Sequence, residues 1–244
     1  MTLVINFSGG KDSCAMLAYL CERYPDMPKR VVFADTGWEH PGTEQWCRDM
    51  VRQISGLELD VCRNPNKTLL TMAERRGKFP GMQTRQCTSD LKRGPIETWI
   101  RRNVTDPVVI SCMGIRSEES TGRKRLSKLR RIQQNSKRTV WQWNPIKDWT
   151  EVEVLAYLSA RSIPLHPVYQ HLRRFSCRVC IYMTVHDLRQ VDKHDPEAVA
   201  IIDGIEQQIG FTMFQGGPIR DVIAGRTKGQ TELFDPSNDP AQCV

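Results

Sequence analysis

The sequence predicts an α/β fold in which a doubly wound, mainly parallel sheet of five strands carries helices on both faces. Two observations indicate this fold. Short apolar runs recur five times within the first 143 residues, and helical patterns follow several of them. Polar, glycine-containing motifs come directly after three of these runs, at residues 8–13, 35–37 and 114–116. Such motifs gather at the carboxyl edge of a parallel sheet, where ligands of this fold class bind.

Five strands are expected, mostly from short apolar runs; the third instead alternates Leu57, Leu59 and Val61 with acidic residues. They cover residues 3–7, 31–34, 57–61, 107–112 and 139–143. One helix is expected to open at Ser13 and to end before Pro25, because proline interrupts a helix. Another helix is expected over residues 68–76.

A mostly helical region is expected after residue 146. Thr150 and Glu153 have the spacing of a capping box, so a helix begins there. A further helix begins at Asp195-Pro196 and ends at Gly210. The side chains expected to face inward are Val154, Leu155 and Leu158 in the first helix, and Val199, Ile202, Ile205 and Ile209 in the second. We therefore divide the chain into residues 1–146 and a helical region, residues 147–244, which ends in an irregular tail and packs on the same core.

The motif after the first strand has the composition of a phosphate-binding loop. It consists of Ser8, Gly9, Gly10, Lys11, Asp12 and Ser13. Glycines allow close approach of the backbone to an anion, and a helix N-terminus offers unpaired N–H groups with a partial positive charge. Asp12 separates Lys11 from Ser13, so the motif is not a Walker A loop. The carboxylate of Asp12 is a candidate Mg²⁺ ligand.

Composition narrows the classes of protein that fit. The chain of 244 residues has no apolar stretch long enough to span a membrane, and its first residues read as a strand rather than a signal sequence. We therefore expect a cytoplasmic protein without a membrane partner. In that compartment thiols stay reduced, so the nine cysteines are not expected to form a disulfide framework.

The net charge of +7 is concentrated in one segment. Residues 122–138 hold eight basic side chains and no acidic one, whereas the rest of the chain has 27 bases and 28 acids. A positive field of this kind attracts polyanions such as tRNA or DNA, although a small anion could also use a few of the arginines. The candidate nucleic-acid-binding residues are Arg123, Lys124, Arg125, Lys128, Arg130 and Arg131.

Four further motifs, in this order, give the chain a family resemblance. They are residues 35–41 (DTGWEHP), 86–95 (QCTSDLKRGP), 114–120 (GIRSEES) and 144–150 (NPIKDWT), the last followed by Ile163-Pro164. Together with the loop at residues 8–13, they resemble the phosphoadenosine phosphosulfate (PAPS) reductase family, within the adenine nucleotide α-hydrolase, or PP-loop, superfamily. The resemblance extends from the N-terminus to about Cys180.

The resemblance implies a PP-loop domain over residues 1–146 that binds ATP and Mg²⁺. The reductases, which receive an already activated sulfate, tend to have a degenerate loop, whereas the loop of this chain is complete. We therefore expect an enzyme that cleaves ATP to AMP and pyrophosphate and activates an acceptor for sulfur transfer. The residues expected near the nucleotide are those of the loop, Asp35, Thr36, Gly114 and Arg116, with Lys11, Asp12, Arg116 and Lys92 in the chemistry. Lys92 would favour a thiolate at Cys87.

The resemblance also bears on three cysteines. Cys177 and Cys180 have ligand-type spacing, and Cys87 lies 90 residues before Cys177. Together they could hold a [4Fe–4S] cluster whose fourth ligand is unknown. Cys112 is a spare candidate, although core packing suits its place at a strand end better. A zinc site and reduced, metal-free thiols remain the alternatives.

Two other functions stay open at this point. The first is a PAPS or adenylylsulfate reductase that makes sulfite with thioredoxin, with Cys243 as the nucleophile, although the residues around Cys243 do not match the family's tail. The second is a nucleotide-sensing, nucleic-acid-binding subunit without catalysis. The sequence leaves the acceptor and the sulfur donor undetermined, with a cysteine desulfurase as one candidate donor. It also leaves the oligomeric state open, with a homodimer as one option.

Overall fold

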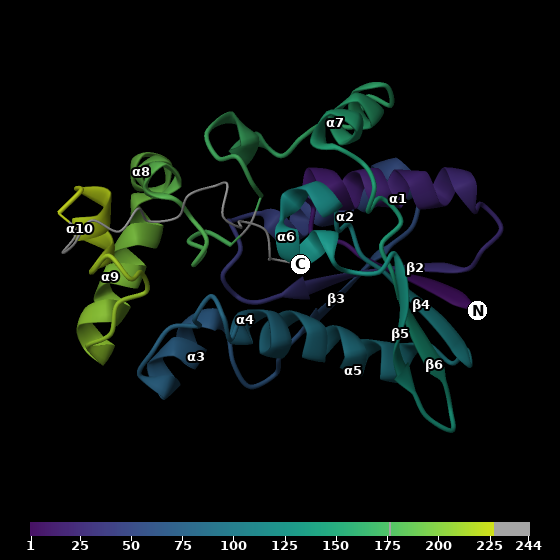
Figure 1. The fold of residues 1–244 in the computed structure, drawn as a ribbon, viewed down its shortest axis with the longest axis horizontal. Coiled ribbons are helices and arrows are strands. Elements are labelled where there is room, and N and C mark those ends of the chain that lie inside the picture. Colours follow the sequence, from purple (N-terminus) through teal and green to yellow (C-terminus); the bar gives the residue numbers. More distant parts are fainter. Residues whose placement is uncertain (176, 227–244) are drawn as a thin grey trace.

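The computed structural model describes residues 1–175 and 177–226. Their strands form one sheet of six strands in the order β3-β2-β1-β4-β6-β5 (Figure 1). The bounds are β1 Thr2–Asn6, β2 Lys29–Asp35, β3 Leu59–Arg63, β4 Val108–Cys112, β5 Leu129–Gln134 and β6 Thr139–Trp143. All neighbouring pairs are parallel except β5 and β6. The α/β fold class is therefore confirmed, with one strand more than expected.

The extra strand, β5, lies within the basic segment. The prediction of five strands is wrong here because β5 lacks the signal of a buried strand. Its only apolar residues, Leu129 and Ile132, are both exposed, and all six of its residues face solvent. Pairing with β6 gives it strand geometry despite this, as an antiparallel edge strand with an irregularity between Arg131 and Gln133.

Alternate residues of the central strand β1 pack on opposite faces of the sheet. Leu3 and Ile5 belong to a core shared with helices α1 (Lys11–Arg23), α2 (Thr43–Ser55) and α7 (Glu151–Ser159). Val4 belongs to a second core, shared with α5 (Gly94–Asn103). Because side chains alternate along a strand, one strand contributes to both layers. Figure 1 shows α1, α2 and α7 on one side of the sheet and α5 on the other.

The C-terminal helices form a third core together with α3 (Leu69–Arg76). Helices α8 (Val185–His194), α9 (Pro196–Ile209) and α10 (Ile219–Ile223) pack together and against α3. Figure 1 shows this group at the left of the molecule. The shorter elements are α4 (Gln86–Thr88), the π-helical turn η1 (Ser89–Arg93), the 3₁₀ turns η2 (Ser117–Glu119) and η3 (Pro167–Gln170), and α6 (Thr121–Lys124).

Most expected helix signals are confirmed. The capping box of α7 forms, since the hydroxyl of Thr150 accepts from the N–H of Glu153 and the Glu153 carboxylate accepts in return. The inward face of α9 and its stop at Gly210 are also as expected. The expectation for Leu155 is wrong: this side chain is 38% exposed and lines a cavity instead of packing in the core. Among the helices of the described residues, none has the length and apolar composition needed to cross a membrane.

Candidate active site

A cavity of about 900 Å³ opens at the carboxyl ends of β1 and β4. Residues directly after these strands line it, as the fold class predicts for a ligand site. Nine of the described residues that line it are basic and five are acidic, so the cavity favours an anion. The basic ones are Lys11, Arg85, Lys92, Arg93, Arg116, Arg123, Arg130, Arg173 and Arg174, and the acidic ones are Asp12, Glu118, Glu119, Glu151 and Asp187.

The loop at residues 8–13 forms one wall of this cavity. Gly9 has a φ of +76°, and a Cβ at this position would lie 2.7 Å from the Cys47 sulfur and 2.9 Å from Cδ1 of Trp46. The indole N–H of Trp46 donates to the Gly9 carbonyl over 3.0 Å. Only glycine can adopt this conformation in so little space without strain. The loop is therefore fixed from behind by α2.

The same loop places the start of α1 at the cavity. Gly10 is the N-cap residue and has no side chain that could cap the N–H groups of the first helical turn. The Ser13 hydroxyl donates to the Gly10 carbonyl over 2.9 Å and accepts from the N–H of Ser8 over 3.3 Å. The N–H of Lys11 donates to the Tyr169 hydroxyl over 3.1 Å. The C-terminal region thus reaches the loop through Tyr169.

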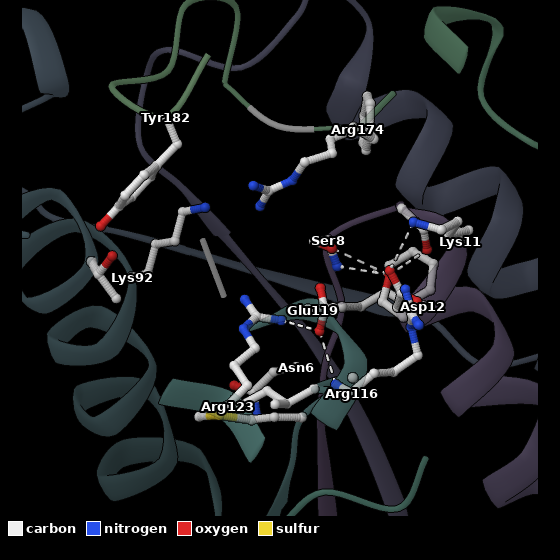
Figure 2. A pocket seen from close by; sticks show the side chains of 18 of the residues that line it. Asn6, Ser8, Lys11, Asp12, Lys92, Arg116, Glu119, Arg123, Arg174 and Tyr182 are labelled. Carbon is white, nitrogen blue, oxygen red and sulfur yellow. Dashed lines mark hydrogen bonds and ion pairs between the residues drawn. The ribbon is translucent and has the colours of Figure 1, made fainter. Parts of the chain in front are cut away.

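Charged side chains beside the loop form a connected network. The Lys11 amine lies 3.3 Å from an oxygen of Asp12 and 3.3 Å from an oxygen of Glu151. The Arg116 guanidinium lies 2.6 Å from the other oxygen of Asp12 (Figure 2). It also lies 2.5 Å from Glu118. Burial works against the charge on Lys11, but the neighbouring carboxylates outweigh it and raise its pKa. Lys11 is therefore a cation at neutral pH.

Gly114 allows the segment after β4 to approach α1 closely. A Cβ on Gly114 would lie 3.1 Å from the carbonyl carbon and oxygen of Asp12. This close approach brings Arg116 to Asp12 across the two strand ends. Glu119, one turn further, accepts from the N–H of Arg116 over 2.8 Å and pairs with Arg123. The predicted residues of the loop, Gly114 and Arg116 therefore lie together.

Asp35 and Thr36 are not among the residues that line the cavity. Asp35 accepts from the N–H of Gly37 over 2.8 Å and pairs with Arg63 at 3.2 Å. Thr36 donates its hydroxyl to Glu39 over 2.7 Å. Both residues shape the turn after β2, and their predicted place near adenosine stays a prediction.

Lys92 lines the cavity and points into it (Figure 2). Its charge acts on Glu39: burial raises the pKa of this carboxyl, and Lys92 partly opposes the rise. Cys87 is not among the residues that line the cavity. The expected influence of Lys92 on a Cys87 thiolate therefore remains a prediction.

The three cysteines predicted as cluster ligands belong to one core. Cys180 is buried in the C-terminal core, and Cys87 and Cys177 pack against it. In residues 1–175 and 177–226, however, no three His, Cys, Asp or Glu side chains come close enough together to hold a metal ion. The ligand assignment of Cys87, Cys177 and Cys180 therefore stays a prediction. Cys112 is fully buried in the core, as its place in the strand predicted. Cys243 lies outside the described residues.

The predicted nucleic-acid-binding residues separate into two groups. Arg123 is buried in the cavity wall beside Glu119, and its assignment to nucleic-acid binding stays a prediction. The side chains of Lys124, Arg125 and Arg131 are exposed. Lys128 and Arg130 are also exposed, but both contact other side chains. Lys128 forms an ion pair with Asp148 at 2.7 Å, and Arg130 donates a hydrogen bond to Gln142.

Sequence reasoning missed the far wall of the cavity, which comes from the C-terminal region. Arg173, Arg174, Tyr182 and Asp187 line it together with Tyr169. The pair Arg173-Arg174, three residues before Cys177 and within a loop stiffened by prolines, is the signal that could have found it. No periodicity links these residues to the loop at Ser8, since only the tertiary fold brings them together.

Comparisons with known proteins identify a family and several relatives. The family model of the phosphoadenosine phosphosulfate reductase domain matches residues 2–185. An uncharacterized 37.8 kDa protein of Escherichia phage 186 is 24% identical over 97% of this chain and 80% of its own length. A phosphoadenosine 5'-phosphosulfate reductase of Xanthomonas campestris pv. campestris is 28% identical over 68% of this chain. The chain spans 65% of the length of that reductase.

Two solved structures are also similar. A PAPS reductase from Candida auris in a phosphate complex has a TM-score of 0.48 and 17% identity, over 69% of this chain and 76% of its own. The U34-tRNA thiolase NcsA from Methanococcus maripaludis, with its [4Fe-4S] cluster, has a TM-score of 0.49 and 16% identity, over 92% and 71%. The family model covers well over half of the chain, including both walls of the cavity up to α8. The chain therefore belongs to the phosphoadenosine phosphosulfate reductase domain family.

Proposed function

We propose that this protein is an ATP-dependent adenylating enzyme that cleaves ATP to AMP and pyrophosphate. In this reaction an acceptor oxygen attacks the α-phosphorus, the bond to the β-phosphate breaks, and pyrophosphate leaves. A sulfur nucleophile then displaces AMP from the activated acceptor. Adenylation is needed because the unmodified acceptor oxygen is a poor leaving group.

The observation that carries the proposal is the arrangement of Lys11 and the start of α1 in the cavity wall. The Lys11 amine is a buried cation next to the N-terminus of α1, where Gly10 supplies no capping side chain. Together they can hold the β and γ phosphates and stabilise the charge that develops on departing pyrophosphate. The excess of basic over acidic residues in the cavity suits a ligand with the charge of ATP.

Asp12 and Arg116 fit the remaining charge requirements of ATP cleavage. Asp12 presents carboxylate oxygens at the loop, which is the ligand type that Mg²⁺ prefers. Mg²⁺ held there would neutralise charge on the phosphates. Arg116 lies on the opposite side of Asp12 from Lys11 and can contact the α-phosphate.

Replacement of Asp12 with Asn tests this function. The variant should release no pyrophosphate from ATP in the presence of Mg²⁺, sulfide and bulk tRNA or DNA, whereas the parent protein should. Arg52→Ala, an exposed site on α2, is the matched control and should behave as the parent does. Release of pyrophosphate by the Asp12 variant at the parent's rate would exclude the mechanism.

The acceptor that we propose is a nucleic acid, tRNA or DNA. Support comes from the exposed lysine and arginine side chains of residues 124–131, which lie on β5 and on the segment before it. Leu126 and Arg130 of this segment line the cavity, as does Gly122 just before it, so a polyanion bound outside would lead directly to the nucleotide. The sulfur donor would be an external protein such as a cysteine desulfurase.

A [4Fe–4S] cluster on Cys87, Cys177 and Cys180 remains a separate proposal. Its support is the cysteine spacing and the common core of the three residues. No step of the proposed reaction depends on it. Iron and sulfide analysis of anaerobically purified protein decides between the cluster, zinc and reduced thiols.

A second candidate function is reduction of PAPS to sulfite, which the 28% identity to the Xanthomonas reductase favours. This reaction would need a thiol nucleophile, for which Cys243 is the candidate. Sulfite formation from PAPS and thioredoxin that disappears in a Cys243→Ser variant would establish it. Absence of sulfite from the parent protein would exclude it.

A further inference from the structure

The wall of the cavity that faces the loop carries a second set of ligand-binding groups. Figure 2 shows Lys92 and Arg174 pointing toward one another across the cavity, away from Lys11 and Asp12. Lys92 comes from η1 and Arg174 from the segment after η3. Two cations that converge in this way create a strong local field for an anion. Arginine and lysine are also the usual phosphate-binding side chains.

Asp187 adds a hydrogen-bond acceptor to the same wall. It is only 8% exposed, and its Oδ2 accepts from the N–H and hydroxyl of Thr184 and from Arg173. Its Oδ1 is buried and has no hydrogen-bond partner among the described residues. Hydrogen bonds from Thr184 and Arg173 lower the pKa of Asp187 despite its burial, so it is ionised. A buried carboxylate oxygen without a donor is costly unless a water molecule or a ligand supplies one.

Tyr182 supplies an aromatic surface beside these groups. Its hydroxyl donates to the Met82 carbonyl over 2.9 Å, which fixes the ring at the cavity wall. A second, water-sized hollow of about 20 Å³ adjoins the cavity here, lined by Tyr182, Arg174, Asp187 and Cys180 among others. A fixed tyrosine ring can stack on any nucleobase, because every base has a flat aromatic face.

A phosphate site, a buried acceptor and a stacking surface together match one chemical class. A nucleotide unit offers a phosphate, N–H or O–H donors and a flat ring. The cavity, at about 900 Å³, is at the upper end of the sizes that hold single small ligands. It therefore has room for ATP at the loop and for a second group opposite.

We propose that Lys92, Arg174, Tyr182 and Asp187 form a second subsite, which holds one nucleotide unit of the acceptor. This inference rests on the proposed function, because it places the acceptor across the cavity from ATP. The unit could belong to a polynucleotide drawn into the cavity or could be a free mononucleotide. The shared chemistry is a phosphate next to a hydrogen-bond donor.

Binding measurements on the full chain test the subsite. The protein is saturated with Mg²⁺ and an ATP analogue that has a methylene group between the α and β phosphates. Three probes are then titrated: bulk tRNA, labelled single strands of about 12 nucleotides in RNA and DNA form, and cytidine monophosphate. Binding of the single strands or tRNA alone identifies a polynucleotide, and binding of cytidine monophosphate as well identifies a free nucleotide as sufficient.

Arg174→Ala is the leading variant, because Asp187 also caps α8 and its replacement could affect folding. The variant should bind the probe at least about tenfold more weakly, because it loses one charge-assisted hydrogen bond. Arg174→Lys should recover part of the affinity, and Arg52→Ala should match the parent. The melting temperature of each variant excludes loss of folding as the cause.

Two results would overturn the subsite. One is that no probe binds the parent protein, with or without the analogue. The other is that Arg174→Ala binds the probe as tightly as Arg52→Ala does. The proposed function fails separately, if the parent does not bind the ATP analogue or if Lys11→Ala leaves that binding unchanged.

Discussion

The loop at residues 8–13 and strand β5 are both rich in charged side chains, but these side chains lie in opposite environments. At the loop, Lys11, Asp12 and Arg116 are largely buried and paired with one another. Along β5, Arg131 and its neighbours are exposed at the edge of the sheet. Buried ion pairs are costly to assemble, whereas exposed charges affect folding little. The first set therefore points to chemistry inside the fold, and the second to a partner outside it.

The largest expected effect comes from Gly9→Ala. An alanine at this position would have to adopt a φ of +76°, and its Cβ would lie 2.7 Å from the Cys47 sulfur. Backbone strain and overpacking would therefore both destabilise the variant. We expect a loss of about 4 kcal/mol in the free energy of unfolding, together with loss of ATP binding. Urea denaturation and calorimetric titration measure the two effects.

Gly56 provides the control for this change. It has a φ of +68° at the end of α2, but a Cβ there would meet no atom within 4 Å. Gly56→Ala should cost about 1 kcal/mol and leave ATP binding intact. Equal effects at Gly9 and Gly56 would mean that the close packing behind the loop is unimportant.

The next largest effect is expected for Arg116→Ala. It leaves the Asp12 carboxylate without its 2.6 Å partner in a part-buried position. We expect a loss of about 3 kcal/mol in the free energy of unfolding and no release of pyrophosphate. In the double variant with Asp12→Ala, part of the stability should return, because the carboxylate that lost Arg116 is then absent as well. Strictly additive losses would show that the pair is not coupled.

A smaller effect on stability is expected when pH changes the charge of His40, which lies in an aromatic cluster behind the loop. His40 stacks with Phe175 at 6.0 Å, and Phe175 in turn lies against Gly9. Burial, followed by the charge of His166, lowers the pKa of His40 to about 4. Because the unfolded chain binds this proton more readily than the folded protein, stability should fall as pH drops from 6.5 toward 4.

The loss attributable to His40 should be about 2 kcal/mol. It is measured by urea denaturation at pH 7 and pH 5, in the parent and in His40→Gln. The variant should show a weaker dependence on pH than the parent. If stability depended on pH identically in both proteins, a group other than His40 would be responsible for the change.

The smallest effect on stability is expected at the basic surface. Replacement of Lys124 and Arg131 with Ala should change the free energy of unfolding by less than about 0.5 kcal/mol. The logarithm of the binding constant for nucleic acid falls linearly with the logarithm of the salt concentration, and the replacement should make this fall less steep by about one unit per removed contact. An unchanged slope would mean that nucleic acid does not bind this surface.

The same contrast explains what the sequence could predict. The strands around the loop and the helix at Thr150 were predictable because local signals, such as apolar runs and a capping box, agree with the tertiary fold. Strand β5 was not, because it becomes a strand only through pairing with β6. Leu155 faces the cavity although its spacing resembles that of core residues.

The site shows the same division. The loop, Gly114 and Arg116 were predictable because each follows a strand that ends at the same edge. Tyr169, Arg174 and Asp187 were not, because their contacts with the cavity depend on how the C-terminal region folds back over the sheet. Neither sequence spacing nor helical periodicity encodes that contact.

The most direct test of the central claim is a competition experiment on the parent protein and Lys11→Ala. ATP, AMP, pyrophosphate and PAPS displace a labelled ATP analogue from the cavity. If the loop holds the β and γ phosphates, ATP should bind at least about tenfold more tightly than AMP, as one charge-assisted contact would give. Pyrophosphate should compete, and Lys11→Ala should remove the preference for ATP. PAPS binding more tightly than ATP, with no competition by pyrophosphate, would contradict the account.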